Sequence, residues 1–468
     1  MILMEIVKEL KKILGSENVF TDELILSLHS KNAIGKVGKA IALVVPENAK
    51  QISDILKLCY KHDVKIFPQG ASTELSGSST PRNGIIMSFS KMNKIEEINI
   101  TDGYTVVEPG VKLIDLNDAL AEEGYMFPVD PASIKAATVG GAINTGAGGM
   151  KGAKYGTMKD WVLGLEIALP NEEGSIVKLG TKTLKSRQGY DLVRLIVGSE
   201  GTLGIVTKAI LKIIPMPENI IFVSAFFKTP EAAMNAINDV KKMKLFPVIT
   251  EFLDEDVVKM GKESMGIDVK GEGNMVIIGL ESSIESSKRH LEVLIEIMKK
   301  AKATHVEFAL SEKEAEEKGL LTLRRAFYPL AINLGSKEYG SSEKLMLIED
   351  IAVPTSKLSE AIKAVKEVGK KYGFTVLIGG HVWDGNLHPT IWANLENAQK
   401  VESFHLEIME EAIKLGGTIS AEHGIGEMKR KGLELEMKSM GSEEALEIMR
   451  KIKSIFDPKN ILNPGKVV

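Results

Sequence analysis

Residues 138–149 read Thr-Val-Gly-Gly-Ala-Ile-Asn-Thr-Gly-Ala-Gly-Gly, a run of small residues that is too long and too apolar for an ordinary exposed linker. A second such segment, residues 68–77, reads Pro-Gln-Gly-Ala-Ser-Thr-Glu-Leu-Ser-Gly. It follows a predicted strand, helix and strand over 41–45, 48–62 and 64–67. Consecutive backbone N–H groups with small side chains and hydroxyls suit a backbone that wraps a pyrophosphate. The two segments together favour a ligand cradle over a pair of surface turns.

The cradle lacks the two commonest nucleotide motifs. The sequence contains neither a G-x-x-x-x-G-K-[ST] loop nor a G-x-G-x-x-G that opens a helix. This argues against a nucleoside triphosphatase and against a Rossmann dinucleotide site.

Composition narrows the class of protein further. The chain has 468 residues, 44% of them apolar, which suggests about three structural units at roughly 150 residues each. A net charge of −4 provides no general attraction for nucleic acid or an anionic membrane. Cys59 is the only cysteine, so an internal disulfide framework, a cysteine-built zinc site and an iron–sulfur cluster within one chain are excluded.

The first residues and the length of the apolar runs indicate the cellular location of the protein. Apolar residues between 2 and 14 recur at helical spacing with Lys and Glu between them, which predicts a surface helix rather than a signal peptide. No apolar run approaches the ~18 residues that span a bilayer. We expect a cytoplasmic protein, at most peripheral to the membrane.

The composition of the sequence changes after Pro215 and Pro217, where glycine becomes less frequent. Three strand–helix–strand passages follow, over 220–249, 275–306 and 345–377, and they predict an α+β sheet domain. We expect domains at 1–215 and 216–410. Residues 411–468 are expected to form a helical segment that returns to the first domain.

Further motifs fit the same cradle: Glu108-Pro109-Gly110-Val111, Asp130-Pro131-Ala132-Ser133, Lys154-Tyr155-Gly156, Gly189-Tyr190-Asp191-Leu192 and residues 198–207. With the two small-residue segments they resemble, over essentially the whole chain, the FAD-linked oxidases of the vanillyl-alcohol-oxidase or p-cresol-methylhydroxylase type. The resemblance implies an α+β fold with a two-part FAD-binding domain and a C-terminal oxidase domain of antiparallel sheet and helices. It also implies FAD contacts from Gly70, Ala71, Ser72, Thr73, Ser76, Gly77, Ser133, Thr138, Gly141, Asn144, Gly148, Glu200, Gly201 and Ile205.

The sequence predicts that FAD is bound noncovalently. Some relatives tether FAD through a histidine in or beside these loops, but residues 68–80 and 130–156 contain none. His29 and His62 lie in predicted helices and are expected to be ordinary surface histidines.

The second half carries a candidate metal site in Gly380–Pro389 and Ser420–Gly426. On a straight strand His381 and His388 would face opposite sides, but a turn at Asp384-Gly385-Asn386 can return both imidazoles to one side. A carboxylate from Glu422 could complete a three-ligand site with open positions. Two satisfied histidines at strand ends are the alternative reading.

The same segments resemble those of D-2-hydroxy-acid dehydrogenases, in which the two histidines and the glutamate hold a divalent metal. The resemblance makes His381, His388 and Glu422 the metal ligands and His423 the active-site base. Zinc suits this donor set, although iron or manganese also does. On extended chain Glu422 and His423 would point to opposite sides of the backbone.

A hydroxy acid needs a cation for its carboxylate. The segment Leu323-Arg324-Arg325-Ala326 matches the pattern of the family's substrate-binding arginine, which gives this role to Arg324. A solvated helix face is the alternative for both arginines.

The predicted activity is oxidation of a D-2-hydroxy acid, D-lactate or glycolate by preference, to the 2-oxo acid with hydride transfer to FAD. The alternatives are a non-catalytic flavin subunit that relays electrons and an alcohol or phenol oxidase. The electron acceptor is expected to be a quinone, an electron-transferring flavoprotein or an iron–sulfur subunit, and a homodimer is possible.

Two departures from the family pattern favour a small substrate. Trp383 stands where relatives usually carry glycine, and its indole could narrow the pocket or pack outward. Ile348 stands where hydroxyglutarate enzymes carry a lysine, although Lys344 lies close enough in sequence to substitute.

Overall fold

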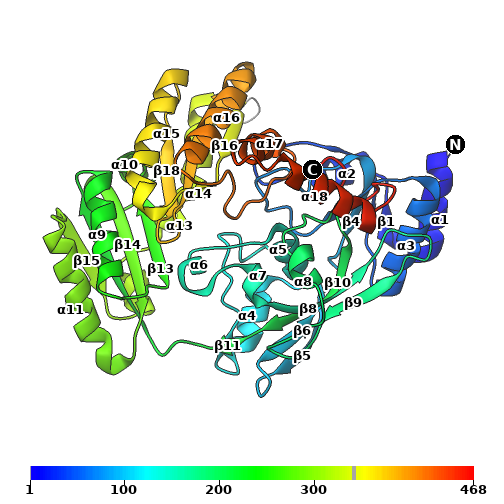
Figure 1. Ribbon diagram of the computed structural model, residues 1–468, viewed down its shortest axis with the longest axis horizontal. Helices are drawn as coiled ribbons and strands as arrows, with labels where there is room; N and C mark the ends of the chain where they lie inside the picture. The colour runs from blue at the N-terminus through cyan, green and yellow to red at the C-terminus, as the bar shows by residue number, and fades with distance from the viewer. Residues whose placement is uncertain (1, 340–343) are drawn as a thin grey trace. The chain divides into compact units, whose positions relative to one another are not determined.

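The computed structural model describes the backbone of residues 2–339 and 344–468 and the side chains of residues 4–335 and 345–468. Two compact units make up the chain: the first comprises Met1–Gly148, Thr157–Met216 and Glu422–Val468, and the second comprises Gly149–Gly156 and Pro217–Ala421. The expected domain start at 411 falls inside helix α16 (Ala398–Lys414), so the change of unit comes later, at Glu422. Figure 1 labels many of the elements of both units.

A four-stranded sheet in the first unit contains the expected strand, helix and strand. Its order is β1-β2-β4-β3, over Val19–Phe20, Lys39–Val44, Arg82–Ser88 and Ile66–Gln69. Strands β2 and β3 do not pair with each other, because β4 lies between them and is parallel to both. Helix α3 (Ala49–His62) connects β2 to β3; the Asn48 side chain caps its first turn, and Asp63 ends it in the left-handed conformation.

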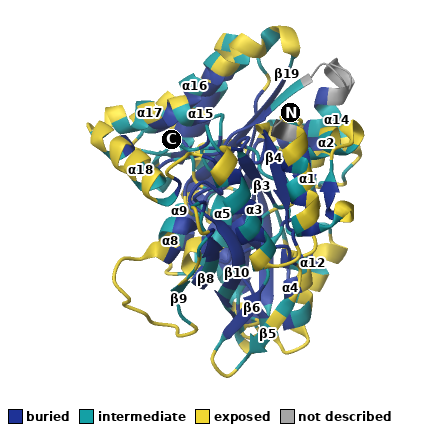
Figure 2. Ribbon diagram, turned by 90° about the vertical axis from the view of Figure 1, so that its right-hand side faces the viewer, coloured by how far each residue is buried: buried dark blue, intermediate teal, exposed yellow. Residues whose placement is uncertain are grey.

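The rest of the first unit is antiparallel sheet. Five strands have the order β5-β6-β10-β8-β9, over Ile95–Asn99, Tyr104–Val107, Ile205–Lys212, Val162–Ala168 and Ile176–Gly180. Strands β6, β8 and β10 are largely buried (Figure 2). A small sheet pairs β7 (Tyr125–Met126) with β11 (Ile214–Pro215).

Helices of the first unit include the N-terminal one expected from spacing. The described helices besides α3 are α1 (Ile2–Leu14), α2 (Glu23–His29), α4 (Leu113–Ala121), α5 (Val139–Thr145), α7 (Met158–Trp161), α8 (Leu192–Ile196), α17 (Arg430–Ser439), α18 (Glu443–Phe456) and the 3-10 turn Ser16–Asn18. Helix α1 buries Ile6, Leu10 and Leu14 in a core that it shares with α3 and the four-stranded sheet.

The second unit is built on one antiparallel sheet, as the three strand–helix–strand passages predicted. Its order is β15-β12-β14-β13-β18-β19-β16, and β17 also pairs with β19. The strands span His305–Ala309 (β15), Ile220–Phe227 (β12), Asn274–Glu281 (β14), Ile249–Leu253 (β13), Leu377–His381 (β18), Asn386–Asn394 (β19), Lys344–Ile348 (β16) and Ile351–Ala352 (β17).

Helices cover both faces of this sheet. They are α9 (Pro230–Lys242), α10 (Glu255–Met265), α11 (Ile284–Lys300), α12 (Glu312–Glu317), α13 (Thr322–Arg325), α14 (Phe327–Tyr339), α15 (Leu358–Tyr372), α16 and the short α6 (Gly152–Tyr155), with 3-10 turns at Thr355–Lys357 and Leu395–Asn397. Figure 1 shows α9 and α11 alongside β14 and β15. Helices α10, α12, α13 and α14 contribute to the core on the other face.

Within the described residues, the structure contains no helix with the length and apolar character needed to cross a membrane.

Candidate functional site

The two small-residue segments meet in the first unit. A Cβ atom on Gly70 would lie 2.6 Å from Thr138 Oγ1 and 3.3 Å from the Cα of Gly141, so only glycine permits this approach. Thr138 caps helix α5, and its Oγ1 accepts a hydrogen bond from the Gly141 N–H at 3.2 Å. The expected cofactor residues Gly70, Thr138 and Gly141 therefore form one continuous surface of backbone.

The far end of α5 contacts the turn at 198–201. Asn144 Oδ1 accepts from the Gly201 N–H at 3.1 Å, and the Asn144 carbonyl accepts from the Glu200 N–H at 2.7 Å. A Cβ on Gly146 would lie 3.3 Å from the Cα of Gly198. Hydrogen bonds from the side chain and the backbone of Asn144 thus bring it together with Glu200 and Gly201, which are distant in sequence.

The Glu74 side chain binds the backbone of the residues that follow it in the first loop. Its carboxylate accepts hydrogen bonds from the backbone N–H groups of Ser76, Gly77, Ser78 and Ser79 at 2.6–3.1 Å. Four N–H groups around one carboxylate form an anion-binding nest. Ser76 and Gly77 were expected to contact FAD, but their N–H groups here are engaged by a side chain of the same loop.

A cluster of cations borders this loop. Glu427 is paired with Lys36 at 3.2 Å, with Lys466 at 2.8 Å and with Arg82. Burial opposes ionisation, but the hydrogen bonds from Arg82 and Lys466 lower the pKa of Glu427 to about 2. Lys466 Nζ also donates to the Gly77 carbonyl at 2.7 Å. Three cations therefore surround Glu427 beside the first loop.

Glu200 connects the cradle to the last segment of the chain. Its buried carboxylate accepts from the N–H groups of Ile425 and Gly426, both at 2.7 Å. Burial, the largest effect, raises the pKa of Glu200 to about 7, although these two hydrogen bonds act in the opposite direction. The role of the Glu200 side chain in this structure is therefore to hold residues 424–426.

The remaining expected cofactor residues line the same loops. Ser72 has a φ of +54°, Ser133 accepts from the Ala136 and Ala137 N–H groups, Ile205 begins β10, and Ala71 and Thr73 flank Ser72. A Cβ on Gly148 would lie 2.7 Å from Glu422 Oε2.

His29 is more than a surface histidine. Its Nδ1 lies 3.3 Å from Gln69 Oε1, and the Gln69 side chain donates to the His29 carbonyl at 2.7 Å. His29 therefore contacts the residue just before Gly70, whereas His62 is exposed.

In the second unit a hairpin brings the two expected metal-binding histidines together. Strands β18 and β19 pair with Gly379 opposite His388, and residues 382–385 form the turn. Since residues two apart on a strand share a face, His381 and His388 lie on the same side of the sheet. Their ring centroids are 5.1 Å apart, and both side chains are buried. The turn at 382–385 has the effect expected from the odd spacing.

Each ring has its Nδ1 beside an oxygen. His381 Nδ1 lies 2.7 Å from Glu251 Oε1, and His388 Nδ1 lies 3.2 Å from the Glu349 carbonyl. A proton on each Nδ1 leaves a lone pair on each Nε2, the arrangement in which neutral imidazoles ligate a metal. Two such imidazoles are suitable ligands for a divalent cation.

Arg324 and Arg325 have different environments. Arg324 is buried and pairs through Nε with Glu251 Oε2. Arg325 is exposed and pairs with Glu316 at 3.0 Å. The solvated-face alternative describes Arg325 only.

Glu251 and Asp350 were not expected from the sequence. Burial opposes ionisation of Glu251, but His381 and Arg324 lower the pKa of this carboxyl. An Asp350 oxygen lies within 4.8 Å of a His388 ring nitrogen. The Asp350 carboxylate also accepts from Asn386 at 2.7 Å and from the Ala421 N–H at 2.9 Å, so Asn386 is more than a turn former.

Glu422 and His423 begin the last segment of the first unit. His423 Nε2 lies 3.7 Å from Glu422 Oε1, and residues 421–423 form a bend rather than extended chain. The condition under which the two side chains would point to opposite sides is therefore not met.

Trp383 packs outward. Its ring makes an edge contact with Phe246 at 5.8 Å, Lys241 Nζ lies 4.8 Å from its centroid, and Lys241 donates to its carbonyl. Ile348 is buried opposite Thr390 and so shares the sheet face of His388. The Lys344 side chain lies outside the described residues.

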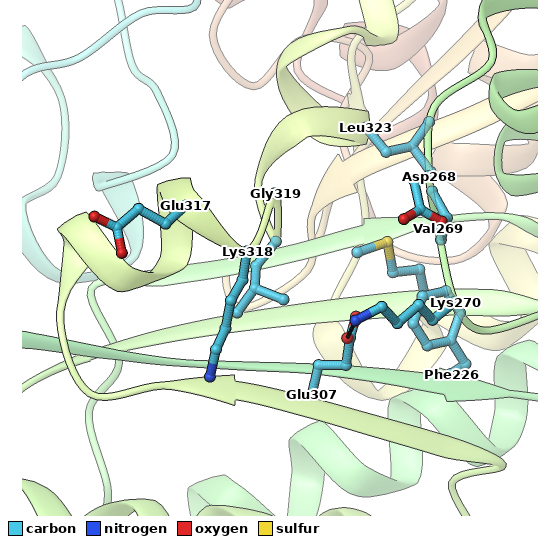
Figure 3. A pocket seen from close by; sticks show the side chains of 11 residues that line it. Phe226, Asp268, Val269, Lys270, Glu307, Glu317, Lys318, Gly319 and Leu323 are labelled. Carbon is cyan, nitrogen blue, oxygen red and sulfur yellow. Dashed lines mark ion pairs between the residues drawn. The ribbon is translucent and has the colours of Figure 1, made fainter.

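A separate pocket of about 310 Å³ lies elsewhere in the second unit (Figure 3). Its lining includes Phe226, Leu323 and an ion pair between Lys270 and Glu307 at 3.3 Å. It contains none of the expected site residues.

The chain matches two protein families along its length. Residues 40–180 match the FAD binding domain, and residues 216–467 match the C-terminal domain of FAD linked oxidases. These matches define an FAD-dependent oxidoreductase with the expected α+β fold. The chain belongs to the FAD-linked oxidases.

Its relatives include two whole-length matches. It is 37% identical to the glycolate oxidase subunit GlcD of Bacillus subtilis, over 100% of this chain and 97% of the relative. It is 34% identical to a D-lactate dehydrogenase of Archaeoglobus fulgidus, over 92% of each. The fold matches that of p-cresol methylhydroxylase with a TM-score of 0.78 at 19% identity, covering 99% of this chain and 96% of that one.

Proposed function

We propose that this protein oxidises a small D-2-hydroxy acid, D-lactate or glycolate by preference, to the 2-oxo acid. The observation that carries the proposal is a chain of buried contacts in the second unit: Glu251 pairs with both Arg324 and His381, and the His381 ring packs against that of His388. An arginine suits the substrate carboxylate, and two imidazoles suit a metal beside its hydroxyl. The names of two relatives, a glycolate oxidase subunit and a D-lactate dehydrogenase, agree with this substrate class.

The residues would divide the work as follows. Arg324 holds the carboxylate, and His423 accepts the hydroxyl proton as the Cα hydrogen leaves with its electron pair. His381, His388 and Glu422 would hold a divalent metal, zinc by preference, which lowers the pKa of the hydroxyl. The loops of the first unit would hold FAD noncovalently, and FAD would supply the hydride acceptor. A quinone, an electron-transferring flavoprotein or an iron–sulfur subunit would be the electron acceptor.

A non-catalytic electron relay is the competing function. The word subunit in the name of one relative is compatible with it. An electron relay requires the FAD loops but does not require a buried arginine or two buried histidines. The presence of Arg324, His381 and His388 therefore favours a catalytic function.

The side chain of Ile348 favours a short substrate. Ile348 adds an apolar surface on the same sheet face as His388, so a second carboxylate at this position would meet an uncharged side chain. An unpaired buried charge costs several kcal/mol. Trp383 no longer supports this argument, because its indole packs against Phe246.

Anaerobic flavin bleaching tests the function. D-lactate and glycolate should bleach the flavin, whereas L-lactate should not, and D-2-hydroxyglutarate should react with a much lower kcat/KM. Metal analysis of the same sample should find a divalent ion. Bleaching by D-2-hydroxyglutarate in preference to D-lactate would refute the size argument, and no bleaching by any hydroxy acid would favour the relay.

Arg324→Lys tests the clamp, with Arg325→Lys as the matched control. Loss of a charged, two-point hydrogen bond should lower kcat/KM for D-lactate by about 10- to 100-fold, mainly through KM. Arg325 is exposed, so its variant should behave as wild type. Equal effects of the two variants would count against Arg324.

A further inference from the structure

Glu251 is a charged residue at a position where a strand normally carries an apolar one. Its side chain is completely buried, and Ile249 and Leu253, which share its face of β13, belong to the hydrophobic core. Burying a carboxylate is costly unless charge and hydrogen bonds compensate it. The partners of Glu251 therefore indicate why the residue is there.

The two carboxylate oxygens have different partners. Oε1 accepts from His381 Nδ1 at 2.7 Å, and Oε2 accepts from Arg324 Nε. His381 is the direct cross-strand neighbour of Glu251 in the β13–β18 pair, so the sheet register fixes this contact. Arg324 comes from the separate helix α13.

The first contact determines how His381 can ligate. A carboxylate on Nδ1 holds the proton there, fixes the ring plane and makes the Nε2 lone pair more basic. Nε2 is then the nitrogen with which His381 binds a cation.

The contact between Glu251 and Arg324 Nε determines which edge of the Arg324 guanidinium group can bind a ligand. With Nε engaged by Glu251, the two terminal nitrogens form the remaining edge of the guanidinium. Among the described residues, the structure gives these nitrogens no other hydrogen bond partner. That edge matches the two oxygens of a substrate carboxylate.

We propose that Glu251 is a positioning residue that sets both His381 as a metal ligand through Nε2 and Arg324 as the carboxylate clamp, so that metal affinity and substrate affinity depend on one buried carboxylate. This rests on the proposed function for the roles of His381 and Arg324. A carboxylate bonded to the distal nitrogen of a metal-binding histidine typically changes metal affinity 10- to 100-fold.

Glu251→Gln is the decisive variant. Its amide keeps one acceptor oxygen but places an N–H group against the other donor, so it cannot satisfy His381 and Arg324 together. The holoenzyme is stripped of metal with a chelator, and Zn²⁺ affinity is measured by competition. KM and kcat for D-lactate are measured on the reloaded protein. We expect Zn²⁺ affinity to fall about 10- to 100-fold and KM to rise about tenfold or more, with FAD retained.

Asp254→Asn is the matched control. Asp254 is also a buried carboxylate, three residues away, but it caps helix α10 and pairs with Lys366. Its variant should lower stability and leave Zn²⁺ affinity and KM unchanged. If Asp254→Asn causes the same two losses, or if Glu251→Gln causes neither, the proposal is wrong.

A second variant keeps the test decisive if Glu251→Gln does not fold. Glu251→Asp retains the charge but cannot reach both partners, so it should give the same two losses at smaller size. If the wild type binds Zn²⁺ but oxidises no hydroxy acid, the proposed function fails, and the Zn²⁺ affinities still decide the role of Glu251. A wild type that binds neither Zn²⁺ nor Mn²⁺ overturns both.

Discussion

At the scale of single residues, Glu200 makes stability depend on pH. Its pKa is raised from the ordinary 4.5 to about 7, so folding favours the protonated carboxyl. The stabilisation is complete below about pH 4.5 and is lost as the pH rises through about 7. We predict that the free energy of unfolding of wild type, relative to Glu200→Gln, falls by up to about 3 kcal/mol between pH 4.5 and 7.5. Urea unfolding of both proteins across this range measures the difference, and a constant difference would contradict the prediction.

Residues also show what the sequence could and could not predict. His381 and His388 could be paired because the turn residues between them are local signals. Glu251 was missed because its partners lie 73 and 130 residues away, and only the pairing of β13 with β18 brings them together. The one available signal was a glutamate within an apolar strand, Ile-Thr-Glu-Phe-Leu. A buried charge in such a run is a reason to look for a partner.

At the scale of elements, amphipathic helices and strands were predictable from their periodicity, whereas helix α5 was not. Residues 139–145 read as a small-residue loop, but Thr138 caps the first turn and Gly146 ends the helix in the left-handed conformation. These capping residues were visible in the sequence. Seven residues without a polar face gave no periodic signal, so the helix depends on its packing against the neighbouring loops.

The β18–β19 hairpin gives a test at the same scale. Gly385 has a φ of +88°, and a Cβ there would lie 2.0 Å from the Val353 carbonyl oxygen. Gly385→Ala should therefore cost at least about 2 kcal/mol and weaken metal binding by separating the histidines. Gly373→Ala is the control, because that residue also has a positive φ but a Cβ would meet nothing within 4 Å. Thermal unfolding and Zn²⁺ affinity check this, and equal losses from the two variants would exclude the clash as the cause.

At the scale of the whole molecule, the sequence located the main change of unit near residue 215 because prolines mark it. It did not predict that Gly149–Gly156 joins the second unit, where Lys154 and Tyr155 both contact Glu281. The composition of Gly149–Gly156 does not indicate that this segment belongs to the second unit, because its contacts depend on Glu281, more than 120 residues later in the sequence. The expected FAD contacts, by contrast, all fall in the first unit.

The cysteine and the histidines of the first unit indicate whether FAD is attached covalently. In the first unit, Cys59 is fully buried and burial raises its pKa to about 12, and His62 is exposed on α3, so neither suits a flavin tether. His29 is the histidine that contacts the first cradle loop, through Gln69. We predict noncovalent FAD, so acid precipitation should release all yellow colour into the supernatant. His29→Ala should give the same release and the same flavin content. Colour that stays with precipitated wild type but leaves precipitated His29→Ala would show instead that His29 is a covalent attachment point, and the absence of histidine within the loops themselves would then be a misleading signal.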